Sequence, residues 1–124
     1  MIYLTAEQVI MINARHLGGR PAVRDAGLVQ SAVTRPQTVV FGADAYPTLE
    51  EKAAALLHSV ISNHPFVDGN KPTGWAAMET MLVANGHFSG LSEDEAFDLV
   101  MRIAISCSQI EVKEIADGLN VTER

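Results

Sequence analysis

The sequence predicts an all-α protein: a compact bundle of about six helices in a single domain over residues 1–124. Three observations support this. Capping boxes precede apolar runs of helical spacing at three places in the chain. No stretch alternates apolar and polar residues over a useful strand length. The chain has 124 residues, 48% hydrophobic and 19% charged, which is enough for one core without disulfides.

The first two helices are expected over residues 5–16 and 25–33. Each begins at a residue whose side-chain oxygen can accept a hydrogen bond from a backbone N–H group, Thr5 in the first helix and Asp25 in the second. An Arg-Pro pair ends the second helix because proline lacks an N–H group and restricts the residue before it. Residues 36–47, which contain Pro and Gly, are predicted to form a loop.

Four further helices are expected: from Thr48 to about Asn63, from near Asn70 to before Gly86, from Ser92 onward, and from Glu111 to Leu119. Helical spacing assigns an apolar face to the helix after Asn70, made by Trp75, Met78, Met81 and Leu82. In the helix after Ser92, the same spacing predicts a core-facing stripe of Phe97, Val100, Met101 and Ala104.

The bulk composition excludes several classes of protein. A net charge of -6 disfavours binding to DNA or RNA. No basic region precedes an apolar run at the N-terminus, and no apolar stretch reaches the length of a membrane helix, so we expect a soluble, cytoplasmic protein. Cys107 is the single cysteine, which excludes an internal disulfide, and we expect it to be a small buried residue on a helix.

The segment from His64 to Thr73, with the letters HPFVDGNKPT, lies between two predicted helices. The start of a helix offers unpaired N–H groups and the positive end of the helix dipole. Gly69 lets the backbone approach a ligand closely, and Lys71 adds a full positive charge in the first turn. The segment therefore predicts a site for an anion, in particular a polyphosphate.

Other residues of the segment suit the chemistry of phosphate transfer. Asp68 can supply an oxygen ligand to a Mg²⁺ ion that bridges phosphate groups. His64 is of the residue type that most often removes a proton in catalysis, so it can act as a base toward an incoming hydroxyl. Asn70 can cap the helix and donate hydrogen bonds, and Phe66 is expected to anchor the loop in the core. Each residue alone has an ordinary explanation, so the prediction depends on their order.

This segment resembles the signature of the Fic/Doc family, His-x-Phe-x-Asp/Glu-Gly/Ala-Asn followed by Gly or Lys and then Arg. The matching residues are His64, Phe66, Asp68, Gly69, Asn70 and Lys71. Fic proteins that attach AMP to target hydroxyls have Gly after the Asn. Lys71 instead resembles the Doc branch, the death-on-curing toxins, whose short helical chain is similar to this one over nearly its whole length.

The resemblance implies an activity and a set of roles. Doc toxins phosphorylate a threonine of translation elongation factor Tu with ATP and Mg²⁺, which arrests translation. By the same resemblance His64 activates the hydroxyl, Asp68 holds the metal, and Asn70 and Lys71 hold the phosphates. The catalytic residues would then be His64, Asp68 and Lys71, and the nucleotide-binding residues would be Phe66, Gly69, Asn70, Lys71 and Thr73.

Pro72 departs from the family pattern, which has Arg at this position. The change removes a forked cation and one backbone N–H group from the phosphate site, so we expect an intact helix with weakened catalysis. Trp75 stands where Fic proteins have a second Arg, which favours the Doc branch. The string Ser89–Glu93 is the closest match to the internal inhibitory motif of Fic proteins and is interpreted as chance, so inhibition by an antitoxin in trans is expected.

Two other functions stay open at this point. One is AMP transfer, with the nucleotide bound in the opposite sense; the bulk of Lys71 disfavours it. The other is a catalytically inactive module that binds an antitoxin, which Pro72 favours. His16, His58 and His87 have no metal-ligand spacing to one another, and no function is assigned to them.

Overall fold

The computed structural model describes residues 1–106 and 108–124. Cys107 lies outside the described residues, and so does the prediction that it is buried on a helix. The described part contains six α-helices, one short 3₁₀ helix and two small two-stranded sheets, which confirms the all-α prediction. The helices are α1 (Ala6–His16), α2 (Ala26–Thr34), η1 (Arg35–Gln37), α3 (Leu49–Asn63), α4 (Asn70–Ala84), α5 (Glu93–Ser106) and α6 (Val112–Gly118).

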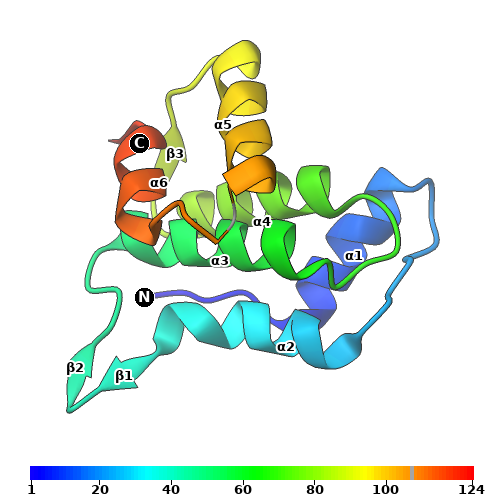
Figure 1. The fold of residues 1–124 in the computed structure, drawn as a ribbon, viewed down its shortest axis with the longest axis horizontal. Coiled ribbons are helices and arrows are strands. Elements are labelled where there is room, and N and C mark those ends of the chain that lie inside the picture. Colours follow the sequence, from blue (N-terminus) through cyan, green and yellow to red (C-terminus); the bar gives the residue numbers. More distant parts are fainter. Residues whose placement is uncertain (107) are drawn as a thin grey trace.

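Helices α3 and α4 form the centre of the molecule, with α1 and α2 on one side and α5 and α6 on the other (Figure 1). The middle of α3 is buried almost all round, and its run Ala53–Ala55 presents small side chains that let neighbouring helices approach closely. The buried face of α4 includes Met78, Met81 and Leu82, as the sequence predicts. No helix among residues 1–106 and 108–124 has both the length and the apolar character needed to cross a membrane.

The three predicted capping sites begin the expected helices. The Thr5 hydroxyl accepts from the N–H of Gln8 at 3.2 Å, and the Gln8 side chain accepts from the N–H of Thr5 at 2.8 Å. Ser92 and Glu95 make the same reciprocal pair at the start of α5, at 3.2 and 2.9 Å. The Thr48 hydroxyl accepts from the third residue of α3 at 3.1 Å.

The apolar stripe predicted for α5 is only partly right. Leu99, Val100 and Ile103 are its buried residues, whereas Phe97 is 65% exposed. The pairs Phe97–Met101 and Leu99–Ile103 both have the four-residue spacing of one helix face, so spacing alone does not distinguish the core-facing stripe from its neighbour. The exposed stripe lines an open groove.

The predicted loop over residues 36–47 contains more structure than expected. After η1, strands β1 (Val39–Val40) and β2 (Ala43–Asp44) form an antiparallel hairpin whose turn has positive φ at two residues, one of them Gly42. Lys52 of α3 is buried, and its Nζ lies 3.4 Å from the Asp44 carboxylate and 3.3 Å from the Pro36 carbonyl. This ion pair fixes the hairpin at the start of α3, at the opposite end of that helix from the α3–α4 loop (Figure 1).

A second antiparallel pair joins β3 (His87–Ser89) to β4 (Val121–Glu123). Strand β3 follows α4 directly, so this pairing ties the last residues of the chain to the end of the central helix. Such short strands are held by their place in the tertiary structure, and their sequences have no alternating pattern long enough to predict them.

Candidate functional site

The candidate site is the loop from His64 to Gly69 that connects α3 to α4. His64 follows the last residue of α3 and has left-handed backbone angles, φ 49° and ψ 58°. Gly69 precedes the first residue of α4 and is also left-handed, with φ 79°. These two residues turn the chain sharply at both ends of the loop, so its central residues are brought back against the helices.

Phe66 anchors the loop from inside. Its side chain is 1% exposed and belongs to the hydrophobic core, as the sequence predicts. Its backbone forms an isolated antiparallel bridge with Val23, and the N–H of Val67 donates to the carbonyl of Ala22 at 2.7 Å. The segment after α1 thus lies along the loop like a short strand. Phe66 therefore supports the loop from the core, and its expected part in nucleotide binding stays a prediction.

Asn70 supports the loop through a pair of hydrogen bonds. Its side-chain oxygen accepts from the N–H of Phe66 at 3.0 Å, and its side-chain nitrogen donates to the Phe66 carbonyl at 2.8 Å. The prediction that Asn70 caps the helix is wrong, because Gly69 is the capping position and Asn70 is the first helical residue. The Asn70 amide does donate, but its shortest bond goes to the loop.

The same amide touches the His64 ring. The Nδ2 atom of Asn70 lies 3.4 Å from Nδ1 of His64. At 3.4 Å the contact is long and its donor and acceptor depend on the ring tautomer, so it orients the imidazole without fixing which nitrogen carries the proton. His64 is exposed. The imidazole is therefore open to a reactant and has one nitrogen able to accept a proton.

Asn13, which the sequence analysis missed, connects three parts of the site. It lies in the interior of α1 and is 0% exposed. Its Nδ2 donates to the Asp68 carbonyl at 3.0 Å and to the Thr73 hydroxyl at 3.1 Å. Its Oδ1 accepts from the N–H of Ala22 at 2.9 Å. A polar residue on the inner face of an amphipathic helix is the one signal that could have identified it.

Thr73 is therefore a supporting residue. It is fully buried, its hydroxyl accepts from Asn13, and its N–H donates to the Gly69 carbonyl at 2.9 Å. Its side chain and its N–H group are both engaged within the protein, and the expected part of Thr73 in nucleotide binding stays a prediction.

Arg24 closes the end of α3. Its Nε donates to the His64 carbonyl at 2.6 Å, and its NH2 group donates to the Asn63 carbonyl at 2.8 Å. The last carbonyls of a helix have no N–H group of the same helix to accept from. A guanidinium group that donates to two carbonyls at this end therefore stabilises the end of α3. This pair of bonds also fixes the backbone of His64.

Gly69 is required for two reasons. Its φ of 79° favours glycine, and a Cβ atom there would lie 3.2 Å from Nδ2 of Asn13 and 3.4 Å from Cδ2 of His16. The sequence predicts that Gly69 lets a ligand approach the backbone closely. In the structure, side chains of α1 already lie close to the Cα atom of Gly69.

The first turn of α4 contains the predicted anion-binding groups. Asn70, Lys71 and Pro72 are its first three residues, and the helix continues without interruption to Ala84, which confirms that proline is tolerated there. The N–H groups of Asn70 and Lys71 belong to the turn in which a helix provides no acceptors. Lys71 is exposed. Pro72 contributes neither an N–H group nor a charge.

Asp68 is exposed and precedes this turn. Within residues 1–106 and 108–124, no three His, Cys, Asp or Glu side chains are grouped so that they could hold a metal ion. A single accessible carboxylate fits Mg²⁺ bound to a nucleotide, since that ion takes most of its ligands from phosphate oxygens and water. It does not fit a metal held by the protein alone.

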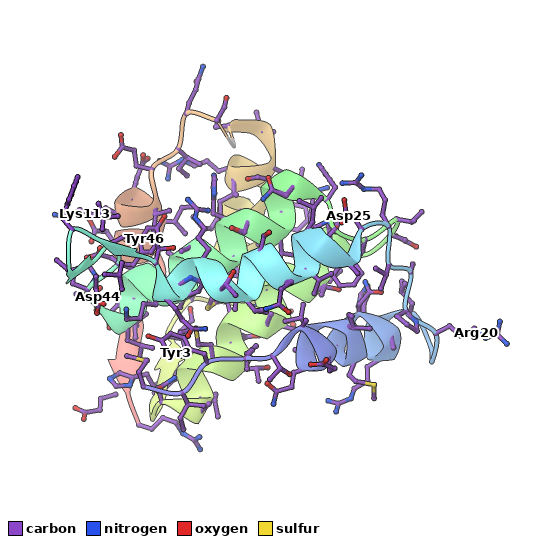
Figure 2. All side chains as sticks on the ribbon, turned by 90° about the horizontal axis from the view of Figure 1, so that it is seen from below. Tyr3, Arg20, Asp25, Asp44, Tyr46 and Lys113 are labelled. Carbon is purple, nitrogen blue, oxygen red and sulfur yellow. The ribbon has the colours of Figure 1, made fainter. Side chains whose placement is uncertain are left out.

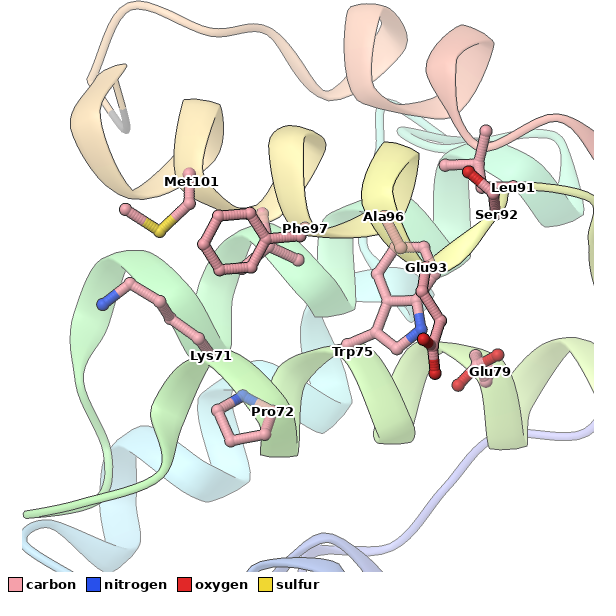
Figure 3. Close-up of a pocket in the computed structure, with 11 residues that line it drawn as sticks. Lys71, Pro72, Trp75, Glu79, Leu91, Ser92, Glu93, Ala96, Phe97 and Met101 are labelled. Atoms are coloured by element: carbon pink, nitrogen blue, oxygen red, sulfur yellow. The ribbon is translucent and has the colours of Figure 1, made fainter.

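A groove of about 670 Å³ runs between α4 and α5 and begins at the motif (Figure 3). Lys71 and Pro72 line one end, and the aromatic rings of Trp75 and Phe97 face it from the two helices. Glu79 and Glu93 line the other part, next to the Trp75 indole (Figure 3). Partial burial raises the pKa of Glu79, while a hydrogen bond from Trp75 opposes that rise. His64 and Asp68 lie outside the lining of this groove.

The remaining histidines have ordinary contacts or positions. Nδ1 of His58 lies 2.8 Å from NH1 of Arg35, and Nδ1 of His87 lies 2.7 Å from the Asn85 carbonyl. His16 ends α1 beside Gly69.

Comparison with known proteins places the geometry in a family context. The family model described as "Fic/DOC family" matches residues 3–82, a range that includes α1, the loop and most of α4. The chain is also similar to a protein named "Toxin Doc" from Mycolicibacterium smegmatis strain ATCC 700084 / mc(2)155. The two are 48% identical over 104 residues, which is 82% of this chain and 80% of the relative. The chain therefore belongs to the Fic/DOC family.

Proposed function

We propose that this protein is a Doc-like toxin that transfers the γ-phosphoryl group of ATP to a threonine hydroxyl of a protein target in the cytoplasm. By family resemblance the target is elongation factor Tu, whose modification arrests translation. The observation that carries the proposal is that an exposed His64 and the Lys71 turn of α4 stand at the two ends of one loop, which Asn70, Asn13 and Arg24 hold in place. Rigid placement of this kind is the main contribution a protein makes to phosphoryl transfer.

In this reaction the hydroxyl oxygen forms a bond to the γ-phosphorus, the bond from that phosphorus to the β–γ bridging oxygen breaks, and ADP leaves. His64 accepts the hydroxyl proton on the ring nitrogen that lacks one. Lys71 and the first N–H groups of α4 contact the phosphate oxygens. Asp68 would hold Mg²⁺, which would supply positive charge to the phosphate groups.

Pro72 weakens this activity. The family Arg would supply a forked donor and a cation at the third residue of α4, and its own N–H group would point toward the phosphates. Loss of a single charge-stabilising group in other enzymes lowers the rate by about 10²- to 10³-fold. The fold of α4 is unaffected by Pro72, so the loss is chemical and a substitution can reverse it.

The proposal is tested by incubating the protein and its Pro72→Arg version with elongation factor Tu and ATP labelled at the γ-phosphate or in the adenine. Transfer of the γ label, stronger with Pro72→Arg and lost with Pro72→Arg combined with His64→Ala, is the expected result. Transfer of the adenine label instead would establish AMP transfer. Transfer of neither label by either version would leave the inactive antitoxin-binding module as the function.

We further propose that an antitoxin binds in trans in the groove between α4 and α5. The groove is open and apolar, and Phe97 is 65% exposed there. Glu79 and Glu93 add negative charge at its edge. An amphipathic antitoxin helix with apolar anchors and a basic flank fits these walls.

This second proposal is tested in cells. Expression of the Pro72→Arg version is expected to arrest growth, and expression of the cognate antitoxin is expected to relieve the arrest. Adding Phe97→Asp should preserve arrest and abolish relief. Ile105→Asp is the matched control, because Ile105 is exposed on the same helix but outside the groove. Relief that persists with Phe97→Asp would exclude the groove as the antitoxin site.

A further inference from the structure

We infer that the end of the molecule around the α3–α4 loop is a docking surface for an acidic patch on the protein that receives the transferred group. The inference rests on the proposed function, since it identifies the partner of the same site. It concerns the chemistry that surrounds the acceptor hydroxyl on that partner.

Charge is distributed unevenly along the chain. Residues 15–25 and 64–71, which meet at this end, contain four of the nine Lys and Arg side chains but only two of the fifteen carboxylates. The other parts of the chain therefore hold five cations and thirteen carboxylates. Although the net charge of the whole chain is -6, the end that contains the candidate site has more positive than negative side chains.

The cations at this end are exposed and not neutralised. Arg15, Arg20, Arg24 and Lys71 are all exposed. The two ion pairs within residues 1–106 and 108–124 involve other residues, Lys52 with Asp44 and Arg102 with Glu114. Arg24 donates to backbone carbonyls, which leaves its charge in place.

Arg20 has no structural task that would explain its position. It lies beyond the end of α1 and extends into solvent, at the opposite end of the molecule from Lys113 and Asp44 (Figure 2). Arg15 lies in the last turn of α1, where a cation complements the helix dipole. Arg20 lies outside α1 and has no such role.

Two carboxylates lie at this end and offset its positive charge only in part. Asp25 accepts from the N–H of Leu28 at 3.1 Å and caps α2, which leaves its charge in place. Asp68 is the proposed ligand of Mg²⁺. Four cations against two carboxylates give this end a formal charge of +2, whereas the whole chain has -6.

Two exposed valines belong to the same segments as the cations. Val23 is 36% exposed and Val67 is 72% exposed, and they lie on the two segments joined by the Val23–Phe66 bridge. Exposed apolar residues on segments that also carry exposed cations match the mixed composition of a protein interface. A partner that fits presents an apolar side chain near its hydroxyl and acidic residues around it.

A nucleic acid is the less suitable partner. Nucleic-acid sites commonly neutralise about 6–10 phosphates, which is more than the cations available here. The thirteen carboxylates elsewhere would also repel a long polyanion. An acidic patch on a folded protein needs only local charge complementarity.

The test measures binding without catalysis. A fluorescent glutamate-rich peptide with a central Val-Thr pair is titrated with the full chain at low salt, and its anisotropy is followed. Arg20→Glu should weaken binding about two- to fivefold, as for a rim charge, and salt should remove the difference. Lys113→Glu makes the same charge change at the opposite end and should leave binding unchanged.

The outcomes separate this inference from the proposed function, because no ATP is present. Binding that Arg20→Glu weakens selectively supports the docking surface even if no phosphoryl transfer is ever detected. Equal effects of Arg20→Glu and Lys113→Glu, or no binding of the peptide, would overturn it. Tighter binding of a single-stranded RNA of equal charge would replace the acidic protein with a nucleic acid.

Discussion

The side-chain amide of Asn13 donates a hydrogen bond to the backbone carbonyl of Asp68 at 3.0 Å, across 55 positions of sequence. The bond joins the interior of α1 to the loop that presents the candidate catalytic groups. It binds the backbone of Asp68 and leaves the carboxylate exposed. The loop therefore owes its shape to a helix that contributes no group to the chemistry.

Asn13→Ala should destabilise the protein by about 2–3 kcal/mol, because it leaves the buried Thr73 hydroxyl and the partly buried Ala22 N–H and Asp68 carbonyl groups without their partner. Urea denaturation measures the change. Gln30→Ala, on the exposed face of α2, should stay within about 0.5 kcal/mol of the wild-type protein. Equal stability of the two variants would mean that water replaces the Asn13 amide at no cost.

Gly69→Ala should be more harmful than Gly86→Ala, although the two glycines have nearly the same φ, 79° and 78°. Both substitutions force a side chain into the left-handed region, at a cost of about 1 kcal/mol or more. Only at Gly69 would the new Cβ also crowd Asn13, at 3.2 Å, whereas nothing lies within 4 Å at Gly86. The difference in melting temperature between the two variants measures the crowding alone. Identical melting temperatures would show that α1 moves aside without a cost in stability.

Local rules account for what the sequence could predict of the fold. Thr5, Thr48 and Ser92 each accept the N–H bond expected of a helix cap, and these bonds join residues three apart, so no knowledge of the tertiary structure was needed. The order of residues from His64 to Lys71 likewise located the candidate loop. The two left-handed residues that shape this loop, His64 and Gly69, both lie within that short stretch of sequence.

Tertiary contacts decide what the sequence could not predict. Asn13 meets Asp68 and Thr73 only after α1 packs on α4, and Phe97 is exposed because α5 turns its other stripe inward. Thr73 and Phe66 belong to the family motif or its edge, yet burial makes them supports of the loop. A motif fixes which residues occur together and does not say which of them face a ligand.

Arg24→Ala should loosen the loop without unfolding the protein. The guanidinium group binds the carbonyls of Asn63 and His64, and it is exposed, so its contribution to global stability is about 1 kcal/mol or less. Local opening should rise more, and the amide of Val67, bonded to Ala22, should exchange hydrogen faster. Arg20→Ala removes an equal charge nearby and serves as the control. An unchanged exchange rate at the Val67 amide would show that Arg24 does not hold the loop in place.

Glu79 and Glu95 should respond to pH in opposite directions. Burial raises the pKa of Glu79 above 4.5, so the folded state holds that proton more tightly and stability is lost as pH rises through the raised value. The Ser92 backbone N–H lowers the pKa of Glu95, so its stabilising effect is present above 4.5 and is lost as pH falls.

Melting temperatures at pH 4 and pH 7 check both signs. The melting temperature of Glu79→Gln should rise relative to that of the wild-type protein as pH rises from 4 to 7. The melting temperature of Glu95→Gln should fall relative to the wild-type value over the same range, because a neutral amide accepts the Ser92 bond less strongly. The same sign for both variants would contradict the assignment of burial to one residue and of hydrogen bonding to the other.

Asp68→Asn tests the proposed metal ligand, the side chain of Asp68, without disturbing the backbone bond that supports the loop. Asn13 binds the backbone carbonyl at position 68, so the substitution keeps that bond and should leave the melting temperature unchanged. An amide binds Mg²⁺ far less strongly than a carboxylate. In the Pro72→Arg background, the Mg²⁺ concentration for half-maximal transfer should therefore rise by at least about tenfold. Asp25→Asn is the control, since asparagine still caps α2 and removes the other carboxylate of this end. If both variants shift the Mg²⁺ requirement equally, the effect comes from the general field of the site, and the metal must be bound by the nucleotide and water alone.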